Sequence, residues 1–487
     1  MYIFGYRHLA PSALAVLLLL PAIQMANADD PFAELEAATA SGSTDAKPQN
    51  TEADDFEAYK KSHQGEFDDY KTKLMEEYAA YTRIAAEETE RYSKELQQVW
   101  DTPELSGPKV WVDYSGDLKE RNSVDFEKKT IAMSTVVDAD DKGVSDERLG
   151  ERLKALLTKN QAQAFSDDKI AQAIEKRSKA ELTMLQTAEV EPEPILLPFV
   201  SDETEPSDEE VNAIVNDLVS KQSRKESTNQ QGQKVVTIEV PLGSEAEEPD
   251  PIPEATPAPK AEPQSKPTPK ASEPVQSTPQ PKAVPAPRQM ADARLNRLPK
   301  AARLLEGDVT TFANSAKMDT ALVYAIIETE SAFNPMAKSP VPAYGLMQIV
   351  PGSAGIDATE QLFGKGRVLA PSYLYTQDKN IEIGSTYLNI LYYRYLKGVN
   401  DPLSRLYCSI AAYNTGAGNV AKAFIGTTRL GTALPKINAM TPEEVYDHLI
   451  ENLPYEETRH YLQRVVSRMD KYRTTDGPLT GSLANAD

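Results

Sequence analysis

The chain has 487 residues, 35 of them proline, with a mean hydropathy of −0.49 and a net charge of −22. This length allows two or three domains, and the composition excludes a chain that is globular throughout, because so much proline and charge indicates folded parts joined by a solvated segment. Residues 288–487 carry 21 Lys and Arg against 20 Asp and Glu, so the whole excess of negative charge lies before residue 288. That charge argues against nucleic-acid binding.

The N-terminal segment has the pattern of an export signal. Arg7 precedes an apolar run, and an A-x-A motif at 26–28 stands before two aspartates. We therefore expect a signal peptide over residues 1–28, cleaved after Ala28. A membrane anchor is the alternative, but the apolar run is shorter than the roughly 20 residues that a span needs. The single cysteine, Cys408, lies far from the cleavage site, so no lipid anchor is expected.

Residues 29–244 are predicted to form an α+β domain. Large residues recur at spacings of three and four within 54–100, which predicts an amphipathic helix with an interruption at Gly65. Valine and aromatic residues then cluster at 109–137, which predicts short strands, the last two joined as a hairpin. A further helix is predicted near 149–157 and a further strand at 234–242.

Residues 245–290 are predicted to form a proline-rich linker. Thirteen of the 39 residues from 249 to 287 are proline, and such a segment is extended because it cannot bury a core. Its reach is on the order of 100 Å when fully extended, enough to let one domain search while the other is held. We interpret it as a passive spacer; a PxxP ligand is the alternative.

From residue 291 to 487 helical patterning dominates, so a mainly α C-terminal domain is predicted, without strands. Its loops are available for chemistry. The expected helices lie near 293–316, 319–331, 380–398, 402–413, 441–452 and 455–472.

Two glutamates stand in the apolar stretch AIIETESAFNPMAK, residues 325–338. Helical phase places Glu330 on the apolar stripe, whereas Glu328 lies about 200° round the helix and should face solvent. A carboxyl among apolar side chains has a raised pKa and can hold a proton at neutral pH, as a general acid must. The alternative is a structural carboxylate paired with an arginine such as Arg459. Position alone leaves both open.

Four motifs run from the end of this helix towards the C-terminus. They are ESAFNP at 330–335, GLMQ at 345–348, AYNTGAG at 412–418 and ETRHY at 457–461. In this order they resemble the lytic transglycosylase domain of the soluble-transglycosylase type, over about residues 305–472. The stretch at 99–131 also resembles the domain that precedes the catalytic unit in the membrane-bound lytic murein transglycosylase C subfamily. The missing lipidation cysteine and the proline-rich stretch depart from that subfamily.

The resemblance implies a lysozyme-like fold for residues 291–487, with Glu330 as the catalytic acid and then base. It also implies a set of residues around the sugar. These substrate-binding residues are Ser339, Met347, Gln348, Tyr413, Asn414 and Tyr461. Taken alone, Ser339 would be interpreted as a turn residue and Gln348 as a hydrogen-bonding residue at a helix end.

The implied reaction is cleavage of the MurNAc–GlcNAc bond of peptidoglycan without water, giving a 1,6-anhydro product. One alternative is hydrolysis with a second carboxylate, for which Asp357 and Glu360 are candidates that more simply solvate their loop. Another is an inactive peptidoglycan-binding scaffold. The expected partners are peptidoglycan glycan strands, with cell-wall synthesis or division proteins as further candidates, and the expected location is the periplasm. No cofactor is expected, and the four histidines have no metal-binding spacing.

Overall fold

The computed structural model describes residues 51–137, 145–201, 203, 205–243 and 298–473. The predicted signal peptide, residues 1–28, and the predicted linker, residues 245–290, lie outside them. No helix among the described residues combines the length and the apolar character that crossing a membrane requires.

The chain divides into two compact units, residues 1–69 and 70–487. Helix α2, Thr51–Leu96, is continuous, so the interruption predicted at Gly65 is absent. The part of α2 that belongs to the second unit buries a stripe of large side chains, which was predicted from their spacing. Tyr81, at the centre of that stripe, is fully buried and donates a hydrogen bond to the Tyr344 hydroxyl at 3.1 Å.

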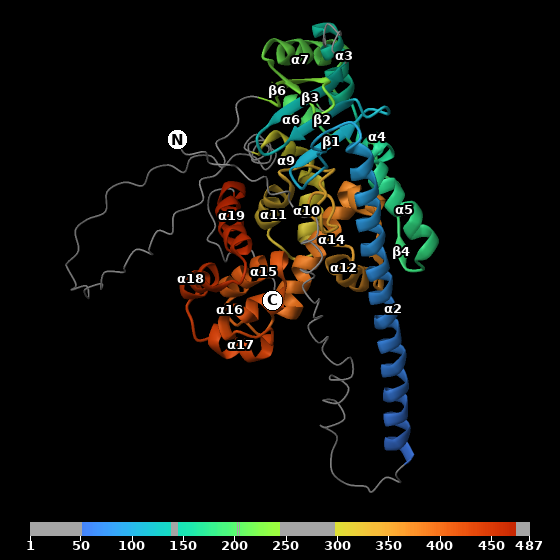
Figure 1. Ribbon diagram of the computed structural model, residues 1–487. Helices are drawn as coiled ribbons and strands as arrows, with labels where there is room; N and C mark the ends of the chain where they lie inside the picture. Colours follow the sequence, from blue (N-terminus) through green and yellow to red (C-terminus); the bar gives the residue numbers. More distant parts are fainter. Residues whose placement is uncertain (1–50, 138–144, 202, 204, 244–297, 474–487) are drawn as a thin grey trace, which may run out of the picture. The chain divides into compact units, whose positions relative to one another are not determined.

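A five-stranded antiparallel sheet forms the centre of the region before residue 244 (Figure 1). Its order is β1-β2-β3-β6-β5, and β2 and β3 form the predicted hairpin. Residues 236, 238 and 240 of β6 are buried and alternate with more exposed neighbours, which is why the sequence predicted this strand. The strands are β1 Val110–Tyr114, β2 Glu120–Asp125, β3 Thr130–Val137, β5 Ser223–Thr228 and β6 Lys234–Pro241.

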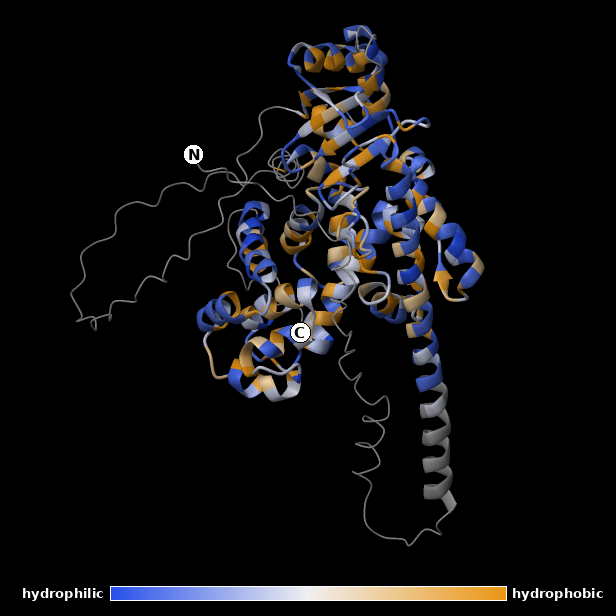
Figure 2. Ribbon diagram, viewed as in Figure 1, coloured by the Kyte–Doolittle hydropathy of each residue, from blue (hydrophilic) through white to orange (hydrophobic). Residues whose placement is uncertain are grey.

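Helices complete this region, so its α+β class is confirmed. In Figure 2 the strands and the helices α3 and α7 carry hydrophobic and hydrophilic residues in alternation. The leucines predicted to mark α3 are all buried, and Ser145 caps its N-terminus. The further elements here are α3 Asp146–Leu157, α4 Gln161–Asp167, α5 Lys169–Glu181, β4 Leu185–Gln186, α6 Leu197–Val200 and α7 Asp208–Ser220.

Residues 298–473 are mainly helical, as predicted. Helix α11 is the centre of this region, with nine of its twelve residues buried, and it packs mainly on α19. The helices are α9 Lys300–Leu304, α10 Glu306–Ser315, α11 Thr320–Ser331, α12 Ala354–Phe363, α13 Pro371–Tyr375, α14 Gln377–Asn389, the π-helix η1 Ile390–Tyr395, α15 Pro402–Thr415, α16 Ala417–Ile425, α17 Leu430–Ile437, α18 Pro442–Asn452 and α19 Glu456–Tyr472.

Residues 70–243 and residues 298–473 pack against each other within the second unit. A short strand that the sequence did not predict, β7 Val368–Leu369, pairs in parallel with β4. Beside it, the backbone N–H of Ser372 donates to the Glu175 carboxylate of α5 at 3.1 Å. This packing differs from the expectation that one domain searches while the other is held, because the buried contacts hold both regions together.

Candidate active site

Glu330 stands in the last turn of α11. The helix begins at the predicted N-cap, Asp319, whose carboxylate accepts from the Ala321 N–H at 2.9 Å. It ends at Ala332, which adopts a left-handed conformation with φ 50°, and Phe333 follows with φ 65°. Two left-handed residues in succession turn the chain away two residues after Glu330. The carboxyl is therefore presented at the end of a buried, rigid helix.

The surroundings of Glu330 favour its neutral form. Burial raises the pKa of this carboxyl from 4.5 to about 7, and the nearby Tyr461 hydroxyl partly offsets the rise. The Tyr461 oxygen is buried and makes no hydrogen bond of standard geometry, so the two groups are close neighbours rather than a hydrogen-bonded pair. The Glu330 side chain keeps some contact with solvent. A proton is thus available near neutral pH.

Charged groups from two parts of the chain act on Glu330. Glu457 raises its pKa, whereas Lys109 and Arg464 lower it, each to a smaller extent than burial. Within the described residues, no cation forms an ion pair with Glu330. The alternative pairing with Arg459 is not formed, and the Nε atom of Arg459 is buried without a partner. Glu330 is therefore not a structural ion-pair residue.

The prediction that Glu328 faces solvent is wrong. Its side chain is only 15% exposed and lies against α19. It accepts hydrogen bonds from Lys471 Nζ at 3.0 Å and from the Tyr472 hydroxyl at 2.7 Å, with Arg468 Nε 3.9 Å away. Because α19 covers the side of α11 that helical phase assigned to water, Glu328 is the glutamate with the structural role.

The GLMQ motif forms a tight turn that two side chains hold. Gly345 has φ 73°, and a Cβ there would collide with Asn380. The Asn380 side chain accepts from the Met347 N–H at 2.8 Å and donates to the Tyr344 carbonyl at 2.9 Å. Gln348 also has positive φ, 47°, so the turn is strained at a residue other than glycine. Asn380 is a supporting residue that no sequence motif indicated.

Tyr413 connects this turn to Glu330. Its hydroxyl donates to the Met347 carbonyl at 2.9 Å, and burial, followed by the charge of Glu330, raises its pKa. The Gln348 side chain donates from Nε2 to the Gly345 carbonyl at 3.0 Å, while its Oε1 is buried and accepts no hydrogen bond. The structure thus brings the turn at Met347 and Gln348 together with Tyr413, and Tyr413 is the residue of this group on which the Glu330 charge acts.

Asn414 and Tyr461 connect α15 with α19. The side-chain Oδ1 of Asn414 accepts a hydrogen bond from the Thr458 hydroxyl at 2.7 Å. Three residues further along α19, Tyr461 is 3% exposed and lies against Glu330. Asn414 is therefore used in holding the ETRHY segment, and Tyr461 is the residue of that segment which borders the carboxyl.

Ser339 is the predicted site residue with the weakest connection to Glu330. Its hydroxyl donates to the Val341 carbonyl and its N–H to the Ala343 carbonyl at 3.1 Å. Among the described interactions none joins Ser339 to Glu330. The adjacent Lys338 is 8% exposed, its Nζ is buried without a partner, and burial lowers its pKa. This loop therefore contains an unpaired buried amine that the sequence analysis did not notice.

Asp357 and Glu360, the two candidates for a second catalytic carboxylate, do not lie in a loop as the sequence predicted. Both lie on α12. Asp357 accepts a hydrogen bond from the Tyr395 hydroxyl at 2.8 Å, and burial raises its pKa, so it does not serve to solvate a loop. The carboxylate with the strongest effect on Glu330 is the exposed Glu457, which sequence reasoning passed over although it begins the ETRHY motif.

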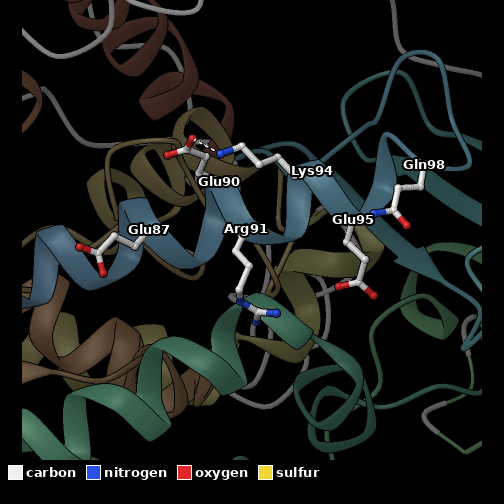
Figure 3. A pocket seen from close by; sticks show the side chains of 6 residues that line it. All are labelled: Glu87, Glu90, Arg91, Lys94, Glu95 and Gln98. Carbon is white, nitrogen blue, oxygen red and sulfur yellow. Dashed lines mark hydrogen bonds and ion pairs between the residues drawn. The ribbon is translucent and has the colours of Figure 1, made fainter.

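A shallow cavity of about 390 Å³ lies elsewhere, on α2 (Figure 3). Its lining residues, all from that helix and the turn after it, are Glu87, Glu90, Arg91, Lys94, Glu95 and Gln98. Glu90 and Lys94 form an ion pair one helical turn apart at 2.6 Å, and both side chains are about two-thirds exposed. These features are typical of a solvated helix face, and the cavity contains none of the predicted site residues.

Residues 310–433 match a family model described as the Transglycosylase SLT domain. Membrane-bound lytic murein transglycosylase C of Sodalis glossinidius is 40% identical over 178 residues, 37% of this chain and 49% of that protein. The protein of the same name from Haemophilus influenzae is 42% identical over 156 residues, which are 32% of this chain and 43% of that protein. A solved structure, the 70 kDa soluble lytic transglycosylase from Escherichia coli, is 25% identical, with a TM-score of 0.27 over 38% of this chain and 29% of that one.

The chain spans about half the length of the curated relatives it matches. Glu330, Met347, Gln348 and Tyr413 all lie within the matched residues 310–433. Part of the chain therefore matches the Transglycosylase SLT domain, and the candidate site lies in that matched region, apart from α19 and Lys109.

Proposed function

We propose that this chain is a peptidoglycan lytic transglycosylase, which cleaves the bond between N-acetylmuramic acid and N-acetylglucosamine without water. The observation that carries the proposal is the state of Glu330 in an SLT domain: a carboxyl with a pKa of about 7, no ion-pair partner, and the buried Tyr461 and half-buried Tyr413 nearby. The printed names of the relatives, which are lytic murein transglycosylases, supply the substrate class.

Glu330 acts first as a general acid. Near neutral pH a large fraction of this carboxyl is protonated, because burial disfavours its charged form. It gives its proton to the bridging oxygen, so that the GlcNAc hydroxyl leaves and positive charge develops at C1 of the muramyl sugar. The acetamido group of that sugar stabilises the charge. The strained turn at Gln348, held by Asn380 and Tyr413, is the surface that we assign to this sugar.

Glu330 then acts as a general base. As a carboxylate in a poorly solvated site it takes the proton of the muramyl C6 hydroxyl, and the C6 oxygen closes onto C1. The product is a 1,6-anhydro sugar, and Glu330 regains the proton that it gave. One carboxyl therefore completes the cycle, so that neither Asp357 nor Glu360 is needed for a second catalytic role.

The roles of the remaining predicted residues follow from their contacts. Met347 is fully buried and supports the turn, while Asn414 holds the start of α19 through Thr458. We assign Tyr461 to the immediate surroundings of the carboxyl and Ser339 to the rim of the cleft. Ser339 has the weakest support, since its hydroxyl is used within its own loop.

Product analysis separates this proposal from its alternatives. Purified protein should release muropeptides one water lighter than the products of hydrolysis, and Glu330→Gln should release none. Hydrated reducing ends would instead favour hydrolysis with a second carboxylate, for which Glu457→Gln would be the next variant. A wild-type chain that binds peptidoglycan but releases nothing would favour the scaffold.

The proposal places this activity in the periplasm. Its support is the export-signal pattern of residues 1–28 and the substrate class, together with relatives whose names describe them as membrane-bound. We propose cleavage after Ala28, a linker over residues 245–290 and a catalytic domain from residue 291. The mass of the protein recovered from the periplasm would test the cleavage, since loss of residues 1–28 is expected there.

A further inference from the structure

The loop that follows Glu330 is hydrogen-bonded to the segment that leads into β1. The Asn334 side chain donates to the Pro108 carbonyl at 3.1 Å, and the Lys338 N–H donates to the Gly107 carbonyl at 3.3 Å. These are backbone carbonyls of consecutive residues, so their contacts fix the course of the chain at this point. The next residue, Lys109, is thereby held against the loop that follows α11.

Contacts within the region that contains β1 also fix the position of Lys109. Its carbonyl accepts from the Phe126 N–H at 2.9 Å, and the Gly107 N–H donates to the Val110 carbonyl at 2.8 Å. Its side chain is 22% exposed and forms an ion pair with Glu127, at the turn between β2 and β3. The ammonium group therefore has a defined place, with Glu127 on one side and the charge of Glu330 within its electrostatic reach.

The charges around Glu330 come from several elements. Glu457 and Arg464 lie on α19 together with the Tyr461 hydroxyl, and Tyr413 lies on α15. Lys109 has a larger effect on Glu330 than Arg464 has, and it is the cation that comes from outside the SLT domain and α19. The region before the linker thus supplies a charge to the candidate site.

We propose that Lys109 is a positioning residue of the active site, whose ammonium group stabilises the Glu330 carboxylate after that group has given up its proton. The inference rests on the proposed function, in which Glu330 must be an acid and then a base. A site without a nearby positive charge would let Glu330 hold its proton near neutral pH, but would make the carboxylate costly to form. A cation that is near Glu330 but does not pair with it lowers the cost of forming the carboxylate, and the carboxyl of the resting enzyme still keeps its proton. Glu127 moderates the effect.

Four variants of the full chain test this assignment, with turnover of purified peptidoglycan measured from pH 5 to pH 9. In Lys109→Met the alkaline fall in turnover should move to higher pH, by about half a pH unit or more, since a neighbouring positive charge is lost. In Glu127→Gln it should move to lower pH, because a negative charge is lost. The double variant should return towards the wild type, and Lys109→Arg should keep the wild-type profile.

A contact between Lys109 and substrate would produce a different result. Lys109→Met would then raise KM while the pH profile of kcat stayed unchanged, and this outcome would overturn the proposal. A merely structural role would lower turnover equally at every pH and lower the melting temperature, which would also overturn it. Equal shifts in the same direction for Lys109→Met and Glu127→Gln would contradict the electrostatic account.

A measurement without substrate keeps this test separate from the proposed function. The pKa of Glu330 follows from the pH range over which Glu330→Gln changes the free energy of unfolding, in the wild-type and Lys109→Met backgrounds. The proposal requires the range to move to higher pH in Lys109→Met. An unchanged range overturns it, whereas a shifted range in a chain without turnover would refute only the proposed function.

Discussion

Replacing Glu330 by glutamine should stabilise the folded protein at alkaline pH while removing its activity. The native carboxyl has its pKa raised from 4.5 to about 7 by burial. At about 1.36 kcal/mol per pKa unit, that difference corresponds to about 3 kcal/mol of folding free energy. This is an upper bound, because the side chain keeps some contact with solvent. Glutamine has nearly the same shape and no charge, so it avoids this cost.

The pH range of the effect follows from the sign of the pKa change. A carboxyl whose pKa is higher in the folded chain is protonated in both states at pH below about 4.5, and ionisation then costs nothing. Between about pH 4.5 and pH 7 the unfolded chain loses its proton first, so the wild-type protein loses stability. Above about pH 7 the full cost remains. The gain from Glu330→Gln should therefore be near zero at pH 4.5 and largest at pH 8.

Chemical denaturation of both proteins at pH 4.5, 6 and 8 measures the effect. The matched control is Glu328→Gln, two residues away, which weakens the contacts with Lys471 and Tyr472. That variant should lose about 1 to 3 kcal/mol at pH 8, as expected of charge-assisted hydrogen bonds in a largely buried position. If Glu330→Gln destabilises the chain at pH 8, or changes its stability equally at all three values, the burial argument for Glu330 is refuted.

Three further outcomes are expected. In the wild-type chain, kcat/KM should fall as the pH rises through about 7, where Glu330 loses the proton it must donate; a profile flat to pH 9 would contradict this. Tyr413→Phe removes the 2.9 Å hydrogen bond to Met347, so denaturation should show a loss of about 1 kcal/mol in the free energy of unfolding. Turnover should fall more than peptidoglycan binding does. Unchanged turnover would exclude a supporting role for Tyr413. Lys338→Met removes an unpaired buried amine and should raise the free energy of unfolding by about 1 to 3 kcal/mol at pH 7. This gain should shrink as the pH approaches about 10, because the amine of the unfolded chain then loses its proton too. A loss of stability in denaturation would show that the Lys338 amine has a partner.

Periodic patterns in the sequence predicted those elements that bury one face. Strands β3 and β6 and helices α3 and α11 were predicted because their apolar residues recur at the period of the structure. Strand β5 was missed because its six residues, SRKEST, are all exposed, so no apolar alternation marks it. Strand β7 has two residues and pairs with β4, far away in the sequence. Such pairing leaves no local signal.

Helical boundaries were less predictable than helices. The helix expected over 293–316 is two helices, α9 and α10, which meet at Leu305. The helix expected over 380–398 ends as the π-helix η1. Helix α17 was missed because Pro435 lies inside it, and proline normally counts against a helix.

The candidate site, too, was only partly predictable from the sequence. Helical phase identified Glu330 but misplaced Glu328, because nearly the whole circumference of α11 is buried and phase cannot tell which neighbour covers each side. The cations that pair with Glu328 come from α19. The motifs located the turn at Gln348, but Asn380, which holds that turn, stands in no motif. Lys109 is distant in sequence, and only the packing of the two regions brings its charge within electrostatic reach of Glu330.

The mass of the released muropeptides tests the central claim most directly. The wild-type chain should release products that carry a 1,6-anhydro ring and are one water lighter than hydrolytic products from the same peptidoglycan, and Glu330→Gln should release none. Products with a hydrated reducing end, or wild-type release by Glu330→Gln, would contradict the account of Glu330 as an acid and then a base.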